Sequence, residues 1–156
     1  EIVMSYYSEK AKVYFRDGYN CAQAVVAAFC DKINIDFDIA VKLASSFGGG
    51  VGRLREICGA VSGMSIIAGL LYGYHSPHDI SAKTAHYKLI QQLAQEFKEE
   101  FGTIICRELL GLSARADSPV PDKRTQEYYE KRPCVHIVAK ATEILEKCIN
   151  EKDSEK

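Results

Sequence analysis

The chain of 156 residues is 47% hydrophobic and 26% charged, an ordinary balance for one globular domain with a sizeable core. Its net charge of −1 gives no electrostatic reason to expect nucleic acid or an anionic membrane as a partner. The first twelve residues are too polar for a signal peptide, so we expect a cytoplasmic protein.

Apolar residues recur at helical spacing through most of the chain, and no useful stretch alternates with the period of a strand. The expected helices lie at residues 2–16, 21–31, 37–45, 57–74, 78–101 and 106–110, after Asp122, and from Pro133 to about Asn150. We therefore predict an all-α fold, a single-domain multi-helix bundle over residues 1–150. A frayed, charged tail is expected at residues 151–156.

The stretch at residues 45–74, SSFGGGVGRLREICGAVSGMSIIAGLLYGY, is unusually rich in glycine. Its last 18 residues carry no charge, and their spaced small residues resemble those of closely packed membrane helices. Glycine and serine lower the hydrophobicity of this segment and no other span is present, which disfavours membrane insertion. We predict a central helix of the bundle at residues 57–74. Close packing that leaves space around the Cys58 sulfur is expected at Gly59, Ala60 and Gly63.

Six cysteines in a chain without an export signal leave redox chemistry, metal binding and simple burial open. Cys21, Cys58 and Cys134 stand at predicted helix starts, where the helix dipole lowers the pKa of a thiol. Cys30 and Cys148 continue apolar helix faces, so we expect them to be packing residues. Because the chain has no Cys-x-x-Cys, any joint site has to be assembled by tertiary folding.

Arginines stand near the cysteines in sequence: Arg53 and Arg55 before Cys58, Arg107 beside Cys106, and Arg132 before Cys134. Sequence neighbours on a helix need not face the same way, so most of these arginines are expected to be solvated surface charges. The three-glycine turn at residues 48–50 is suited to an anion nest, but it lacks the Lys-Ser/Thr of a P-loop. The proline-bearing interval 113–132 is expected to be a surface excursion, either a lid or a plain loop.

Four stretches together resemble a family to which a redox activity is ascribed and which is named for a C…GCAxxG…C…C pattern. The matching stretches are YNCAQAV with Cys21, CGAVSG with Cys58, CRELLG with Cys106, and RPCVHIV with Cys134. The label reads Gly-Cys-Ala where this chain reads Cys-Gly-Ala. The resemblance implies a redox role for the four cysteines and no defined substrate. It also implies a frequent association with transporters and a likeness to part of the split-Soret cytochromes, where an iron–sulfur centre has been considered.

Three hypotheses follow for the four cysteines of this pattern. In the first they gather near the start of the 57–74 helix and carry thiol/disulfide or electron-transfer chemistry, as in a thiol-based oxidoreductase, with Cys58 as the attacking thiolate. In the second they hold an iron–sulfur cluster or zinc, since four cysteines are the ligand number that either requires. In the third they are packing residues of a non-catalytic protein that binds a partner such as a transporter. The redox partner and the oligomeric state stay open.

Overall fold

The computed structural model describes residues 5–113 and 116–156. Over these residues it contains helices and one isolated β-bridge, between Ile57 and Ile105, and no strand. The predicted all-α, multi-helix fold is therefore confirmed. The helices are α1 (Tyr6–Arg16), α2 (Cys21–Ala28), α3 (Phe37–Ala44), the 3-10 turn η1 (Ser45–Phe47), α4 (Gly48–Val51), α5 (Gly59–Tyr72), α6 (Ile80–Phe101), α7 (Cys106–Leu109), α8 (Gln126–Lys131) and α9 (Cys134–Ser154).

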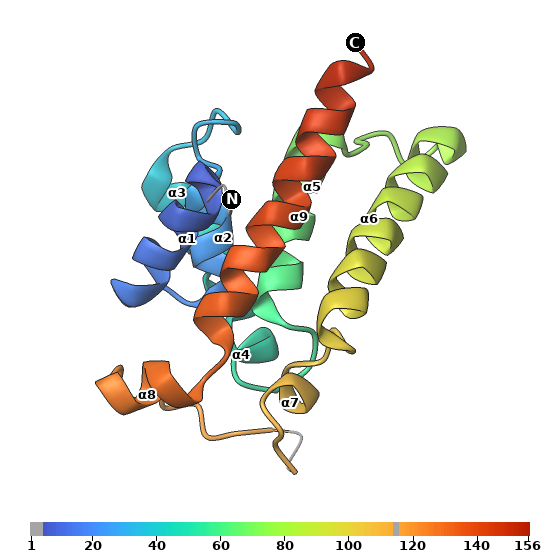
Figure 1. Ribbon diagram of the computed structural model, residues 1–156. Helices are drawn as coiled ribbons and strands as arrows, with labels where there is room; N and C mark the ends of the chain where they lie inside the picture. Colours follow the sequence, from blue (N-terminus) through green and yellow to red (C-terminus); the bar gives the residue numbers. More distant parts are fainter. Residues whose placement is uncertain (1–4, 114–115) are drawn as a thin grey trace.

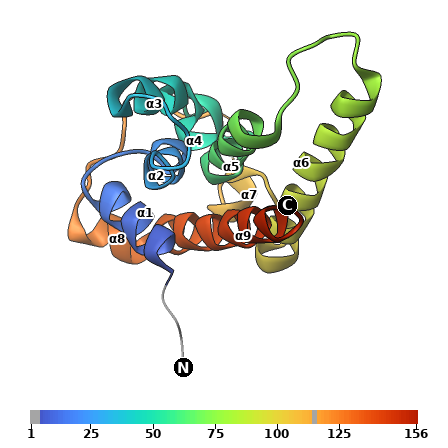
Figure 2. The ribbon, with the colours of Figure 1, turned by 90° about the horizontal axis from the view of Figure 1, so that it is seen from above.

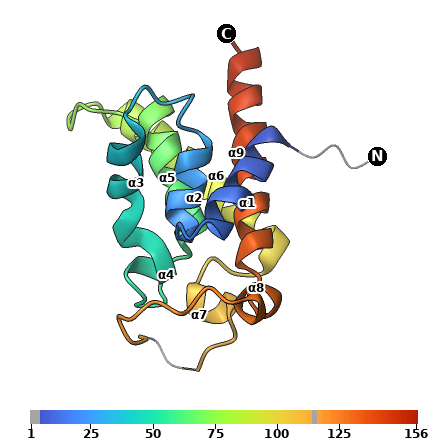
Figure 3. The ribbon, with the colours of Figure 1, turned by 90° about the vertical axis from the view of Figure 1, so that its left-hand side faces the viewer.

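The core is formed where α1 packs against α9 and α2 packs against α5, with α3 and α6 on the two flanks (Figure 1). Seen from above, α6 lies on the outer side of the bundle, and a long loop connects it to α5 (Figure 2). Helices α2, α5 and α9 all begin at the same end of the molecule, the lower end in Figures 1 and 3. The short elements α4, α7 and α8 lie at that end as well.

Helix α2 shares the centre of the bundle with the glycine-rich helix. Its small side chains are almost completely buried, and Asn20 caps its start in a reciprocal capping box with Gln23. The glycine-rich helix is α5, which spans a slightly shorter range than expected. A Cβ atom at Gly63 would stand 2.9 Å from the Cβ atom of Val25, so glycine is what allows α5 to approach α2. None of the described helices is long and apolar enough to cross a membrane.

The two longest helices extend beyond the core. Helix α6 buries Leu89, Leu93 and Phe97, one face of its second half, while its first half is mostly exposed. Helix α9 continues to Ser154, so it includes most of the charged segment 151–156 that was expected to form a frayed tail. Its last residues are mainly Glu and Lys, which favour helix, and a Lys156–Asp153 ion pair spans the end.

Candidate functional site

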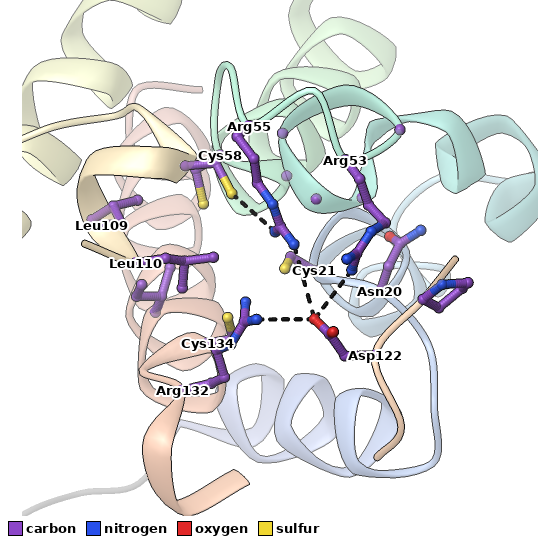
Figure 4. Close-up of a pocket in the computed structure, with 18 of the residues that line it drawn as sticks. Asn20, Cys21, Arg53, Arg55, Cys58, Leu109, Leu110, Asp122, Arg132 and Cys134 are labelled. Carbon is purple, nitrogen blue, oxygen red and sulfur yellow. Dashed lines mark hydrogen bonds and ion pairs between the residues drawn. The ribbon is translucent and has the colours of Figure 1, made fainter. Parts of the chain in front are cut away.

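A pocket of about 270 Å³ lies at the end of the bundle where α2, α5 and α9 begin. Four cysteines from four different elements line it: Cys21, Cys58, Cys106 and Cys134. Figure 4 shows the sulfur atoms of Cys21, Cys58 and Cys134 around this space. All six cysteines of the chain are free thiols, and Cys30 and Cys148 lie away from the pocket in the bundle. Tertiary folding thus brings together the four cysteines of the sequence pattern.

Cys21 and Cys58 come close because two helix starts touch at a glycine. A Cβ atom at Gly59 would stand 2.8 Å from the carbonyl oxygen of Phe47 and 3.2 Å from the Cβ atom of Cys21. A side chain larger than hydrogen at this position would therefore separate the two cysteines. Ala60 follows and is fully buried. The small residues beside Cys58 thus serve close approach between α5 and α2.

A short antiparallel contact carries Cys106 to the pocket. The Cys58 N–H donates to the carbonyl oxygen of Ile104 at 2.8 Å, and the Cys106 N–H donates to that of Glu56 at 2.6 Å. The two bonds fix the segment before α5 against the segment before α7. Gly50 completes the packing, because a Cβ atom there would stand 2.7 Å from the Cβ atom of Cys106.

The glycine-rich turn before α5 has an uncommon left-handed backbone. Five consecutive residues, 49–53, have positive φ values, between 57° and 68°, and Arg55 follows with 61°. Val51 and Arg53 are among them, and a left-handed conformation costs an L-residue other than glycine about 1–2 kcal/mol. Strain of this kind is typical of functional sites, where the surrounding structure enforces it. Here it aims the Arg53 and Arg55 side chains at the pocket.

Arg55 is a buried part of the site, which corrects the expectation of a solvated charge. It is 3% exposed, and its Nη1 atom donates to the Cys106 sulfur at 3.6 Å. Its Nη2 atom contacts the Asp117 carboxylate at 3.1 Å. Within residues 5–113 and 116–156, its buried Nε atom has no hydrogen-bond partner. A guanidinium group therefore links one cysteine of the pocket to the interval that follows α7.

Asp122 joins three arginines at the pocket mouth (Figure 4). Its Oδ2 atom lies 2.9 Å from a guanidinium nitrogen of Arg132, 3.1 Å from one of Arg53 and 3.9 Å from one of Arg55. A further arginine on the same interval, Arg124, lies over the Phe15 ring and donates to the Phe15 carbonyl oxygen at 2.8 Å. The described part of the 113–132 interval thus lines the pocket.

The Cys21 and Cys134 thiols affect each other's ionisation. A hydrogen bond from Cys21 stabilises the Cys134 thiolate and lowers the pKa of Cys134, and the Arg132 guanidinium acts in the same direction. The pKa of Cys21 is raised, because its proton is held in that hydrogen bond and because the half-buried thiol is partly removed from water. When the pair loses a proton, the thiolate is therefore favoured on Cys134, at the first turn of α9.

Burial determines the state of the other two cysteines. It raises the pKa of Cys58, which is 5% exposed, and the Cys21 thiol adds to the effect. The N–H groups of Ala60 and Val61 at the helix start act in the opposite direction but are outweighed. Burial also raises the pKa of Cys106, despite the neighbouring Arg55. Burial therefore disfavours the thiolate that the sequence predicted at Cys58.

Residues 19–148 match the family described as "Putative redox-active protein (C_GCAxxG_C_C)". The chain belongs to this family. The resemblance inferred from the four cysteine-bearing stretches is thereby confirmed. A comparison with curated proteins and with solved structures found no match.

The cysteine pocket does not fit the hypothesis of a zinc site in this arrangement. Over the described residues, no three His, Cys, Asp or Glu side chains are grouped closely enough to hold a metal ion. A tetrahedral zinc site requires four thiolates about 2.3 Å from one centre. We therefore derive no chemistry through a metal.

Several pocket residues carried no clear signal in the sequence. Asp122 and Arg124 lie in a polar interval that reads as a loop, and their partners are distant along the chain. The Arg53 and Arg55 positions were visible only as charges near Cys58. The glycine run at 48–50 was the usable indication of this part of the pocket, because glycine allows positive φ values and close approach of the backbone to other groups.

Proposed function

We propose that this protein is a thiol-based redox protein in which Cys134 and Cys21 cycle between a dithiol and a disulfide. Cys134 acts as the attacking thiolate and Cys21 as the resolving thiol. The observation that carries the proposal is that Cys21 and Cys134 line one open pocket and shift each other's pKa in opposite directions. The wider redox assignment is that of the family.

The helix positions of the two cysteines support this division of roles. Cys134 is the first residue of α9, where the helix dipole stabilises a thiolate, and Arg132 lies close by. The rate of thiol–disulfide exchange depends on the thiolate fraction of the attacking cysteine, which is larger for Cys134 than for Cys21. Cys21 keeps its proton until an oxidised Cys134 sulfur gives it an electrophile to attack.

Cys58 and Cys106 are assigned a supporting part. Both are buried and protonated in this arrangement, and Cys106 is held by Arg55. They shield the reactive pair from bulk water and add polarizable sulfur to the pocket wall. A second disulfide between them is not required by the proposal.

Mild oxidation followed by mapping of the cysteines tests the proposal. The reduced protein is equilibrated with thiol–disulfide buffers of graded potential, alkylated at low pH and analysed by mass spectrometry. We expect a Cys21–Cys134 disulfide to form in a single two-electron transition. The variant in which Cys30 and Cys148 are both serine is the control, since these thiols lie outside the pocket. A different pair, or no disulfide over the whole range, would overturn the assignment.

Anaerobic purification provides the second arm of the test. The four thiols are present in the number that an iron–sulfur cluster needs, so metal content and visible absorption are measured before oxidation. Stoichiometric iron or zinc that is lost when Cys21 or Cys134 is replaced by alanine would refute dithiol chemistry in favour of the metal hypothesis.

A further inference from the structure

The pocket holds more fixed positive than negative charge. Four arginines line it: Arg53, Arg55, Arg124 and Arg132. Among the described residues, two carboxylates form ion pairs with these arginines: Asp117 and Asp122. Arginine forms paired hydrogen bonds with carboxylates, and Asp122 shows that the guanidinium groups are spaced to share one. The Cys134 thiolate adds one negative charge, so the four arginines still leave the pocket with a positive excess.

Part of this positive charge is accessible from outside. The Arg53 and Arg132 side chains are 15% and 24% exposed, whereas Arg55 is buried and has a free Nε donor within the described residues. The pocket volume of about 270 Å³ equals roughly nine water molecules at about 30 Å³ each. That space suits a small organic molecule and not a folded protein surface.

We infer that the pocket recognises a low-molecular-mass disulfide bearing carboxylates, with Arg53 and Arg132 holding a carboxylate while a sulfur of the ligand reaches Cys134. The inference rests on the proposed function, since it names the substrate class of the same cysteine pair. The arginines line the same pocket as that pair, so one ligand can place its sulfur at the cysteines and its carboxylate at the arginines.

The exchange balances in two steps. The Cys134 thiolate attacks one sulfur of the ligand, forms a mixed disulfide and releases the first half of the ligand as a thiolate. The Cys21 sulfur then attacks the Cys134 sulfur, forms the intramolecular disulfide and releases the second half. The Cys21 proton passes to one of the released thiolates. Two electrons move from the cysteine pair to the ligand, which leaves as one thiol and one thiolate.

Three disulfides of similar size and different charge test the inference: 3,3′-dithiodipropionate, bis(2-hydroxyethyl) disulfide and cystamine. The rate of Cys21–Cys134 oxidation is measured for each and divided by its rate with dithiothreitol, which removes differences in intrinsic reactivity. We expect the anionic disulfide to react about tenfold faster than the neutral one, with cystamine slowest and the differences reduced by salt.

Arginine variants locate the preference. Arg53→Gln and Arg132→Gln are each expected to reduce the advantage of the anionic disulfide several-fold. Arg107→Gln is the matched control, because Arg107 has the same exposed fraction as Arg132 but pairs with Glu56 outside the pocket. An undiminished preference in both pocket variants would overturn the inference.

The failure of the inference is distinguishable from that of the proposed function. If the three disulfides oxidise the pair at equal corrected rates, the charge recognition is wrong and the dithiol chemistry stands. If none of them forms the Cys21–Cys134 disulfide, the proposed function itself fails. For a variant that folds poorly, the wild-type protein supplies a second measurement. At each cysteine, the alkylation rate with anionic iodoacetate is divided by the rate with neutral iodoacetamide. This ratio is expected to be larger for Cys134 than for Cys148.

Discussion

Substitution of Gly59 by alanine tests whether close packing of α5 against α2 builds the site. The added Cβ atom would lie 2.8 Å from the Phe47 carbonyl oxygen and 3.2 Å from both the Ala22 nitrogen and the Cys21 Cβ atom. Backbone atoms on two sides limit how far the neighbours can move. The substitution therefore forces the start of α5 away from α2.

The expected magnitude follows from two opposing effects. Overpacking of this kind costs about 1–3 kcal/mol. Replacing glycine by alanine in a helix contributes about 0.5–1 kcal/mol in the other direction. We expect Gly59→Ala to lower the free energy of unfolding by about 1–2 kcal/mol. For a chain of this size that corresponds to a fall in Tm of about 2–8 °C.

Gly69→Ala in the same helix is the matched control. A Cβ atom at Gly69 meets nothing within 4 Å, so helix propensity alone acts and the variant gains about 0.5–1 kcal/mol. Urea denaturation of both variants measures the two free energies, and the rate of Cys21–Cys134 disulfide formation reports on the site. Equal stability of Gly59→Ala and Gly69→Ala would refute the packing argument.

Three further outcomes are expected. Cys21→Ala removes the hydrogen bond to the Cys134 thiolate, so the pKa of Cys134 rises and its alkylation by iodoacetamide begins at higher pH. Cys21→Ser keeps a donor and is expected to shift this pH profile less. An unshifted profile in Cys21→Ala would contradict the pairing. Val51→Gly removes a β-branched side chain from a left-handed position and should stabilise the fold by about 1 kcal/mol in urea denaturation. The control Val13→Gly, within α1, should destabilise the fold by about 0.4 kcal/mol. A loss of stability in both variants would argue against backbone strain at Val51. Asp36→Ala removes the side chain that accepts from two N–H groups at the start of α3, and it should lower the free energy of unfolding by about 1 kcal/mol in the same measurement. Unchanged stability would show that the cap is dispensable.

The sequence predicted the helices well because their signals are local. Asn20 and Asp36 cap the helices expected after them, and glycine follows α6 at the position where the pattern ends. The same local reasoning selected Cys21, Cys58 and Cys134, and the family resemblance added Cys106; the fold collects all four in one pocket. Helix boundaries depend on neighbours within a few residues, which the sequence displays directly.

Thiol reactivity was not predictable in the same way. A helix start lowers the pKa of a cysteine, but the burial that raises it at Cys58 comes from elements distant along the chain. Cys134 shares the helix-start position but differs because the hydrogen bond from Cys21 and the charge of Arg132 both lower its pKa. The buried Arg55 was missed for a related reason. Its partners Cys106 and Asp117 lie about 50 to 60 residues away in sequence.

The pairing of the first helix with the last affects how the protein is made. Helix α1 packs against α9, and Cys21 shares a pocket with Cys134, so neither arrangement can form until α9 has left the ribosome. During synthesis the Cys21 and Cys58 thiols are present for many seconds before their final neighbour exists, at about 5–20 residues per second. A wrong disulfide formed in that interval would trap the chain before α9 docks. Refolding yields are therefore expected to depend on the redox potential of the buffer more strongly than those of a cysteine-free helical bundle.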